Sequence, residues 1–403
     1  MRLAAKIRNA MIKKVRDFLW RTRVIIKLLP FLPLALGIRL IRPFVLVRFC
    51  EIFASRLGHL AGTVDVYVCQ RDADPGRARI KEVIYWFDTP CNRQLANMWE
   101  RSQPVSALAR HIDMANRLLP GHEAHSVPFH GGNDRSGALN NAPQKVFFTA
   151  AERARGEARI AEIAPAATNR IACVFNRDSE YLNRTGQGTD YSYHNYRDSR
   201  IADYRPMIES LLDDGYTVFR MGEHVAERLE IDNPRYIEFT DFYDDFMDVY
   251  LFNRCDLQVG AASGIVCLGR AFRKPTAMVN SAPLFTTSHY RTHEMELFIP
   301  KLYWLKSESR YLKTSEVRAL NAGFLDRSAQ FEDLGIELHD NLPEDILSIS
   351  KEVQGLAEGS LRFTDDDISL QQAFWALALP HEDCREFFQI SPSFVRKYPF
   401  LVE

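Results

Sequence analysis

Residues 169–178 (NRIACVFNRD) and 256–264 (DLQVGAASG) decide the fold class of this sequence. Ile171–Phe175 is an apolar run between polar residues, which predicts a buried strand of a parallel sheet. Arg177 and Asp178 then lie just past the carboxyl end of that strand. A second short strand is expected over residues 256–260, followed by small residues that turn the chain into a helix. Ligands of open α/β sheets bind beyond the carboxyl ends of the strands, so a binding crevice is expected there.

The sequence around these stretches alternates strands and helices. A helix is predicted with Pro206 in its first turn and Gly215 at its end, followed by a strand over residues 216–221. Residues 265–272 predict a second helix, which ends before a strand at residues 276–280. The polar loop at residues 179–199 is rich in Tyr, Asn and Gly and is too long to be a simple connector. The pattern predicts an α/β fold.

The two corners after the strands have the chemistry of an anion site. The small residues Ser263 and Gly264 would let a ligand approach the backbone, where free amides and the helix dipole favour a phosphate. Arg177 at the facing corner would add a charge-assisted contact. Ser263-Gly264 is also a common helix cap, and Arg177 with Asp178 is also a common surface ion pair. Their joint position at strand ends favours the phosphate interpretation.

The first part of the chain predicts a smaller set of strands. Strands are expected over residues 44–49, 64–69 and 83–87, and helices over residues 92–101 and 150–163. Gly58 and His59 fall in the corner between the first two strands, where the imidazole can be a base or a hydrogen-bonded structural group. The predicted divisions are an arm at 1–43, an N-terminal domain at 44–165, a C-terminal domain at 166–345 and packed-back helices at 346–403.

Basic residues are concentrated at the start of the chain. The first 48 residues carry twelve Lys and Arg and one acidic residue, Asp17, although the whole chain has a net charge of -1. Basic and apolar residues are interleaved over residues 2–27, which is typical of an amphipathic helix on an anionic membrane surface. The apolar residues 28–38 are too few to span a bilayer. A signal peptide and a docking arm remain alternatives, while the acidic remainder of the chain disfavours nucleic acid.

Cysteine and acidic patterns do not predict a metal or disulfide framework. The seven cysteines include no C-x-x-C pair, which favours a reducing cytoplasm over a secreted protein. Asp72-Ala73-Asp74 matches D-x-D, but it lies in a Pro-Gly turn and not at a strand end. No metal and no other cofactor is therefore expected. The sequence contains no P-loop and no nucleophile motif, which argues against a kinase or a phosphatase.

Several short motifs together point to a known family. They are Arg56-Leu57-Gly58-His59-Leu60, Asn92 with Leu95, Met98 and Trp99, Arg177-Asp178 with Tyr181, His194 with Tyr196-Arg197-Asp198-Ser199, Arg220-Met221-Gly222, Ser263-Gly264, Lys274-Pro275 with Asn280, and residues 391–394. On these residues, over most of positions 40 to 400, the chain resembles a family of bacterial glycosyltransferases associated with surface-carbohydrate biosynthesis.

The resemblance implies two Rossmann-like domains facing across a cleft, the GT-B architecture. It implies a nucleotide-sugar donor held mainly by the C-terminal domain and a glycan or lipid-linked acceptor entering from the N-terminal side. The His194-x-x-Arg197-Asp198 pattern is similar to the His-x-Arg-Arg stretch of fucosyltransferases, in which Arg holds the donor diphosphate. The spacing differs here, which argues against a fucose donor.

The hypothesis is metal-independent glycosyl transfer on the cytoplasmic face of the membrane. His59 is the first candidate for the base that takes the acceptor proton, and Asp178 the second. The donor diphosphate is expected to lie against the side chains of Arg177, His194 and Arg197 and the amides around Ser263 and Gly264. The nucleoside is expected near Arg220, Gly222 and Glu223, and the acceptor near Arg56 and Gly58. A nucleotide-sugar epimerase and a non-catalytic envelope-assembly protein remain alternatives.

Overall fold

The chain forms two compact units, each built from separate segments. This computed structural model describes residues 22–127 except 24, residue 134, and residues 137–185, 190–285, 295–378 and 389–403. The smaller unit contains Met1–Ser55, Asp74–Pro90 and Trp99–His130, and the larger unit contains Arg56–Ala73, Cys91–Met98 and Gly131–Glu403. The domain boundaries drawn from the sequence stay predictions, and most of the basic arm, residues 1–21 and 24, lies outside the described residues.

A seven-stranded sheet organises the larger unit, and all its neighbouring strands are parallel. The strand order is β12-β8-β7-β6-β3-β4-β5. Both faces of the central strands are buried, as the continuous apolar runs predicted. The strands are β3 (Ile171–Phe175), β4 (Thr217–Arg220), β5 (Tyr236–Glu238), β6 (Leu257–Ala261), β7 (Thr276–Ser281), β8 (Glu296–Pro300) and β12 (Gln389–Ile390).

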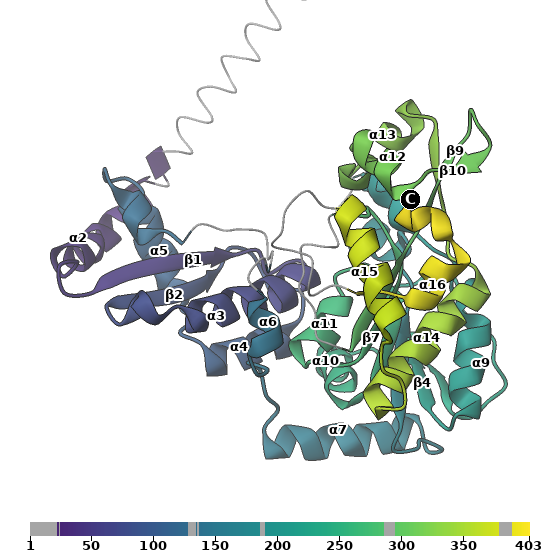
Figure 1. Cartoon of the computed structure of the whole chain (residues 1–403). Coiled ribbons are helices and arrows are strands. Elements are labelled where there is room, and N and C mark those ends of the chain that lie inside the picture. Colours follow the sequence, from purple (N-terminus) through teal and green to yellow (C-terminus); the bar gives the residue numbers. More distant parts are fainter. Residues whose placement is uncertain are drawn as a thin grey trace, which may run out of the picture. The chain divides into compact units, whose positions relative to one another are not determined.

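Helices cover both faces of this sheet. Ala172 and Val174 of β3 face the main core, which includes Met207 of α9 (Arg205–Asp213) and Ile349 of α14 (Pro343–Glu358). The helices α9 and α14 lie side by side, as Figure 1 shows. Phe175, on the opposite face of β3, packs on Phe252 of α10 (Asp245–Arg254) with ring centroids 5.8 Å apart. The chain is therefore an α/β protein built on a parallel sheet.

The other elements of the larger unit connect and flank the sheet. A three-stranded antiparallel sheet has the order β10-β9-β11 and comprises β9 (Leu302–Leu305), β10 (Arg310–Tyr311) and β11 (Ile336–His339). The helices and turns are η2 (His59–Thr63), α3 (Val64–Ala73), α6 (Ala138–Asn141), α7 (Ala150–Ile163), α8 (Glu180–Thr185), η5 (Ser192–Arg197), η6 (Ile201–Tyr204), η7 (Phe239–Phe242), α11 (Val266–Ala271), α12 (Thr314–Ala319), η9 (Ala322–Phe324), α13 (Ser328–Asp333), α15 (Asp365–Ala378), α16 (Pro392–Lys397) and η11 (Pro399–Val402).

The smaller unit is built on two parallel strands. β1 (Leu46–Ile52) pairs in register with β2 (Ile80–Trp86), and single bridges join Ser126 to β1 and Val105 to β2. α5 (Ala107–Asn116) packs on both strands, and α2 (Leu32–Leu40) packs against α5. The remaining elements are η1 (Leu29–Phe31), η3 (Pro75–Arg77) and η4 (His122–His125), and α4 (Arg93–Ser102) contributes residues to both units.

The strand predicted over residues 64–69 is wrong, because this segment is the helix α3. Val64, Val66 and Val68 alternate as in a strand, but Asp65 and Cys69 are buried as well, so the apolar side chains do not define one strand face. Burial on several sides of a helix outweighs the β preference of valine. The strands at β1, β2, β3, β4, β6 and β7 and the helices at α4, α7, α9 and α11 confirm their predictions to within a few residues.

Candidate functional site

A cavity of about 880 Å³ lies within the larger unit, at the carboxyl ends of β3, β4, β6 and β7. β3 and β6 are neighbours in the sheet, but the chain continues from β3 toward β4 and from β6 toward β7, on opposite sides. The loops after β3 and β6 therefore diverge and leave a crevice between them. The cavity wall includes all the site residues expected from the sequence: Arg56, Gly58, His59, Arg177, Asp178, His194, Arg197, Arg220, Gly222, Glu223, Ser263 and Gly264.

Arg177 is fixed at the end of β3 by partners from the loop at residues 190–199. Its guanidinium forms an ion pair with Asp198 and donates a hydrogen bond to the carbonyl of His194 at 3.2 Å. The neighbouring Asn176 donates to the carbonyl of Ser199 at 2.7 Å, and the amide of Ser199 donates to the carbonyl of Arg177 at 2.9 Å. The loop is thus held along its length by the residues that follow β3.

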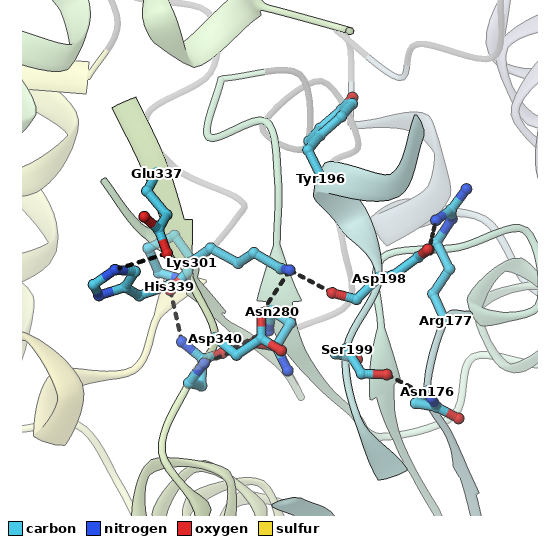
Figure 2. A network of polar contacts seen from close by, with 12 residues as sticks. Asn176, Arg177, Tyr196, Asp198, Ser199, Asn280, Lys301, Glu337, His339 and Asp340 are labelled. Carbon is cyan, nitrogen blue, oxygen red and sulfur yellow. Dashed lines mark hydrogen bonds and ion pairs between the residues drawn. The ribbon is translucent and has the colours of Figure 1, made fainter. Parts of the chain in front are cut away.

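Lys301 supports this arrangement from the far side, as Figure 2 shows. It follows β8 directly and is only 3% exposed. Its ammonium group pairs with Asp340 at 2.6 Å and donates to the carbonyl of Asp198 at 2.5 Å. Lys301 therefore holds the backbone of Asp198, and the carboxylate of Asp198 holds Arg177. Burial lowers the pKa of Lys301. Burial also raises the pKa of Asp198 to about 6, although the nearby cations act in the opposite direction.

Arg197 and His194 bring to the cavity polar atoms that have no hydrogen-bond partner among the described residues. Arg197 donates one hydrogen bond to the carbonyl of Ala262, after β6, at 2.5 Å. Among the described residues, its Nε, Nδ1 of His194 and Oγ of Ser263 are buried and have no hydrogen-bond partner. Burial, reinforced by the charges of Arg197 and Arg177, lowers the pKa of His194 to about 4, so its imidazole is neutral at pH 7. Unsatisfied buried groups of this kind are costly and call for a ligand or water.

Two glycines bring separate backbones into contact at the cavity. A Cβ on Gly264 would lie 2.8 Å from the amide nitrogen of Gly58, and a Cβ on Gly58 would lie 3.2 Å from the Cα of Gly264. The small residue after β6 therefore permits close packing against the turn at residue 58. This contact is a structural reason for Gly264 in addition to the predicted approach of a ligand.

The two candidate bases have different surroundings. Oδ1 of Asp178 accepts from the amide of Glu180 and Oδ2 from the amide of Ala226, each at 3.0 Å. A carboxylate shared between two backbone amides is typical of a structural cap. His59 begins a single turn of π-helix, η2, and its Nδ1 forms a 3.2 Å hydrogen bond with Thr63 Oγ1. π-turns are frequent at functional sites, so the contacts favour His59 over Asp178 as the base.

Arg220 lies in the cavity wall but is almost completely buried. The side chain is 1% exposed and donates to Asn176 Oδ1 at 2.6 Å and to the carbonyl of Met221 at 2.9 Å. Gly222, which follows, has a φ of +145°, and a Cβ there would lie 2.9 Å from the Arg220 guanidinium. These contacts favour a positioning role for Arg220, whereas Glu223 is partly exposed at the cavity wall.

Sequence reasoning did not identify three residues that the structure brings to the site. Tyr243, which follows η7, and Asp248, in the first turn of α10, line the cavity, and α10 was not predicted. Of these three residues, Lys301 alone has a sequence signal that could have identified it, because it is a polar residue directly after a parallel strand. Asp248 belongs to no motif, and no local pattern indicates that it faces a ligand cavity.

The acidic residues in the described part of the chain do not gather as metal ligands. No group of three or more His, Cys, Asp or Glu side chains there has a suitable arrangement. The D-x-D residues are engaged elsewhere: Asp72 pairs with Arg71 and Lys145, and Asp74 accepts from the amide of Gly76. No disulfide joins the six described cysteines to one another.

No helix in the described part of the chain is both long and apolar enough to cross a bilayer. The short apolar stretch at residues 28–38 forms part of η1 and α2.

Comparison with known proteins gives likeness at the level of overall structure. No protein-family model matches the sequence, and no curated protein matches it. The chain is structurally similar to a glycosyl transferase of family 9 from Veillonella parvula, with 9% identity, a TM-score of 0.42 and coverage of 77% of this chain and 97% of the other. It is also similar to ADP-heptose LPS heptosyltransferase II of E. coli, with 13% identity, a TM-score of 0.36 and coverage of 63% and 90%. Likeness at these scores does not establish a function, which has to be inferred from the cavity itself.

Proposed function

We propose that this chain is a glycosyltransferase that takes a sugar from a nucleoside-diphosphate donor without a metal ion. The observation that carries the proposal is the convergence of Arg177, Arg197 and neutral His194 on a cavity at the sheet's switch point. Arg197 Nε and His194 Nδ1 have no protein partner among the described residues. A diphosphate would accept a hydrogen bond from Arg197 Nε. It would also accept one from His194 Nδ1 in the neutral tautomer that carries its proton on that nitrogen.

The leaving group determines what the guanidinium groups have to do. As the bond from the anomeric carbon to the phosphate oxygen breaks, negative charge accumulates on the nucleoside diphosphate. Arg177 and Arg197, held in place before the ligand arrives, would stabilise that charge without rearrangement. The fixed positive charge performs the task that a divalent cation performs in other transferases.

The acceptor hydroxyl has to lose a proton as it attacks the anomeric carbon. His59 is the proposed base, with its ring oriented by Thr63. The proposed acceptor is a cell-surface glycan or a lipid-linked saccharide that approaches past Arg56 and Gly58. The overall architecture we propose is GT-B.

We also propose that residues 25–44 attach the chain to the inner face of the cytoplasmic membrane. Ala35 packs inward against Ala115 of α5, while Leu29, Leu34, Leu36, Leu40 and Phe44 are exposed, the last two at 78% and 76%. The exposed Arg23, Lys27 and Arg42 accompany them, and positions 18–50 include no acidic residue. An apolar face flanked by cations is complementary to an anionic lipid surface.

Donor binding and transfer can be separated in one experiment. The full-length protein is screened by thermal shift against ADP-, GDP-, UDP- and CDP-sugars. Hydrolysis with water as the acceptor, which releases the nucleoside diphosphate, is then followed for the nucleotide sugars that stabilise the protein. His59→Asn should keep donor stabilisation and lower nucleotide release by about 10²-fold or more. His111→Asn, on the exposed face of α5, is the matched control and should behave as wild type.

The alternatives predict other results. An epimerase would convert the bound nucleotide sugar into an isomer without releasing nucleotide and without any acceptor. A non-catalytic envelope protein would neither release nucleotide nor change the sugar. The absence of stabilisation by any of these nucleotide sugars would contradict the proposal.

A further inference from the structure

The cavity has a second polar region, which the diphosphate would not occupy. Asp248 in the first turn of α10, Glu223 in the loop after β4 and Tyr243 after η7 line this region. Asp248 is only 3% exposed, and its Oδ1 has no hydrogen-bond partner among the described residues. The cost of leaving a buried carboxyl oxygen unpaired argues that a ligand supplies the missing partner.

The charges around Asp248 exclude an anion as that partner. Burial, with the nearby charges of Asp245, Glu223 and Asp244, raises the pKa of Asp248 to about 8, so the carboxyl is protonated at pH 7. A protonated carboxyl both donates and accepts, and the carboxylate of Glu223 accepts only. This pair of groups matches a neutral ring with adjacent hydroxyls, since each hydroxyl can donate one bond and accept another.

On the basis of the proposed function, we infer that Asp248 and Glu223 form a hydroxyl-binding subsite for a vicinal diol of the nucleotide sugar. The ribose and the transferred sugar both carry such a diol. The acidic and the cationic residues line the wall of the same cavity, and Tyr181 lines it with them. The donor would therefore extend from the guanidinium groups to the acids.

Three ligands of increasing size test the subsite by calorimetry on the full-length protein. Pyrophosphate carries no diol, a nucleoside diphosphate carries the ribose diol, and the matching nucleotide sugar carries both. ADP, GDP, UDP and CDP, with the glucose derivative of each, are the probes. Asp248→Leu and Glu223→Leu should each weaken binding of a diol-bearing ligand at least tenfold and leave pyrophosphate binding within about twofold.

The pattern of loss identifies the diol. Weaker binding of both the nucleoside diphosphate and the nucleotide sugar assigns the subsite to the ribose. Weaker binding of the nucleotide sugar alone assigns it to the transferred sugar. Asp248→Asn keeps a donor and an acceptor at the same place, so it should retain most of the affinity that Asp248→Leu loses. A purely structural role for Asp248 would not produce loss restricted to diol-bearing ligands.

The exposed neighbours Asp241 and Glu227 provide matched controls, and Asp241→Asn and Glu227→Gln should bind all three ligands as wild type does. Unchanged binding of every ligand by Asp248→Leu and Glu223→Leu overturns the subsite while leaving the proposed function intact, and so does equal weakening of pyrophosphate. A wild-type protein that binds none of the three ligands overturns the proposed function and the subsite together.

Discussion

The two polar regions of the cavity are held in different ways. Arg177 and Arg197 are tied to backbone carbonyls and a carboxylate from two loops, the one at residues 190–199 and the one after β6. Asp248 is buried with one carboxyl oxygen unpaired among the described residues. Both regions leave buried polar atoms for a ligand, but protein groups hold the two guanidinium groups of the cationic region in place. Substitutions should therefore affect charge binding and ring recognition separately.

The largest effect on ligand affinity is expected from Arg197→Ala. This change removes a guanidinium whose Nε is unpaired among the described residues, and it should weaken pyrophosphate binding by about 10²-fold. The exposed Arg200→Ala is the matched control and should bind pyrophosphate as wild type does. Calorimetry with pyrophosphate measures both. Equal affinity in wild type and Arg197→Ala would remove that residue from the anion site.

The second-largest effect is expected from replacing Lys301, which supports the cationic region. Lys301→Met removes the ammonium that pairs with Asp340 and holds the backbone of Asp198. The free energy of unfolding should fall by about 2 kcal/mol. This is less than the 3–5 kcal/mol typical of a broken buried pair because Asp340 is 30% exposed and can be solvated. Urea unfolding measures the loss.

The same change should weaken pyrophosphate binding, because the loop that carries Asp198, the partner of Arg177, is no longer held by Lys301. Pyrophosphate affinity of the folded Lys301→Met protein should fall by about tenfold. Lys306→Met, whose lysine is more than half exposed and pairs with Glu337, is the control for both measurements. An unchanged affinity would show that the loop keeps its place without Lys301.

The acidic region should show itself in the pH dependence of stability. The pKa of Asp248 is about 8 in the folded protein and about 3.9 when unfolded. Between these values the folded chain keeps the proton that the unfolded chain has lost, so stability falls as the pH rises. The slope from this one group approaches about 1.4 kcal/mol per pH unit. Asp248→Asn should lack this slope. Its free energy of unfolding should therefore rise relative to that of wild type as the pH increases from 4 to 8.

The comparison with the variant is needed because other groups titrate in the same range. Burial raises the pKa of Asp198 to about 6, which also makes stability fall with rising pH, while the lowered pKa of His194 acts in the opposite direction between about 4 and 6.5. These contributions cancel in the difference between wild type and Asp248→Asn. Identical pH profiles for the two proteins would mean that Asp248 is charged in the folded state.

The same contrast explains what the sequence could and could not predict. Arg177, Ser263 and Gly264 directly follow apolar strands, and a parallel sheet brings such positions to one edge whatever the intervening sequence is. Lys301 also follows a strand, but its partner Asp198 is 103 residues away in the chain, so nothing local connects them. Asp248 lies inside a helix, where only the three-dimensional packing decides that its carboxyl is buried at a cavity.

The segment 64–69 shows the same limit for secondary structure. Alternating valines predict a strand only when one face is exposed, and here Asp65 between them is buried in an ion pair with Arg273, 208 residues away. Packing on several sides of the segment therefore overrides the local preference.

The smallest effect on the cavity is expected from changes at residues 25–44. Leu36→Glu with Leu40→Glu should leave pyrophosphate and nucleotide affinity unchanged, because these exposed side chains take no part in the cavity. Binding to phosphatidylcholine vesicles containing phosphatidylglycerol should instead fall by about tenfold in co-sedimentation, because two apolar contacts are lost and two negative charges are added. Leu108→Glu places a charge on a similarly exposed leucine of α5 and should bind vesicles as wild type does. Equal binding of wild type to vesicles with and without the anionic lipid would contradict the electrostatic part of this attachment, and unchanged binding of the double variant would contradict the apolar part.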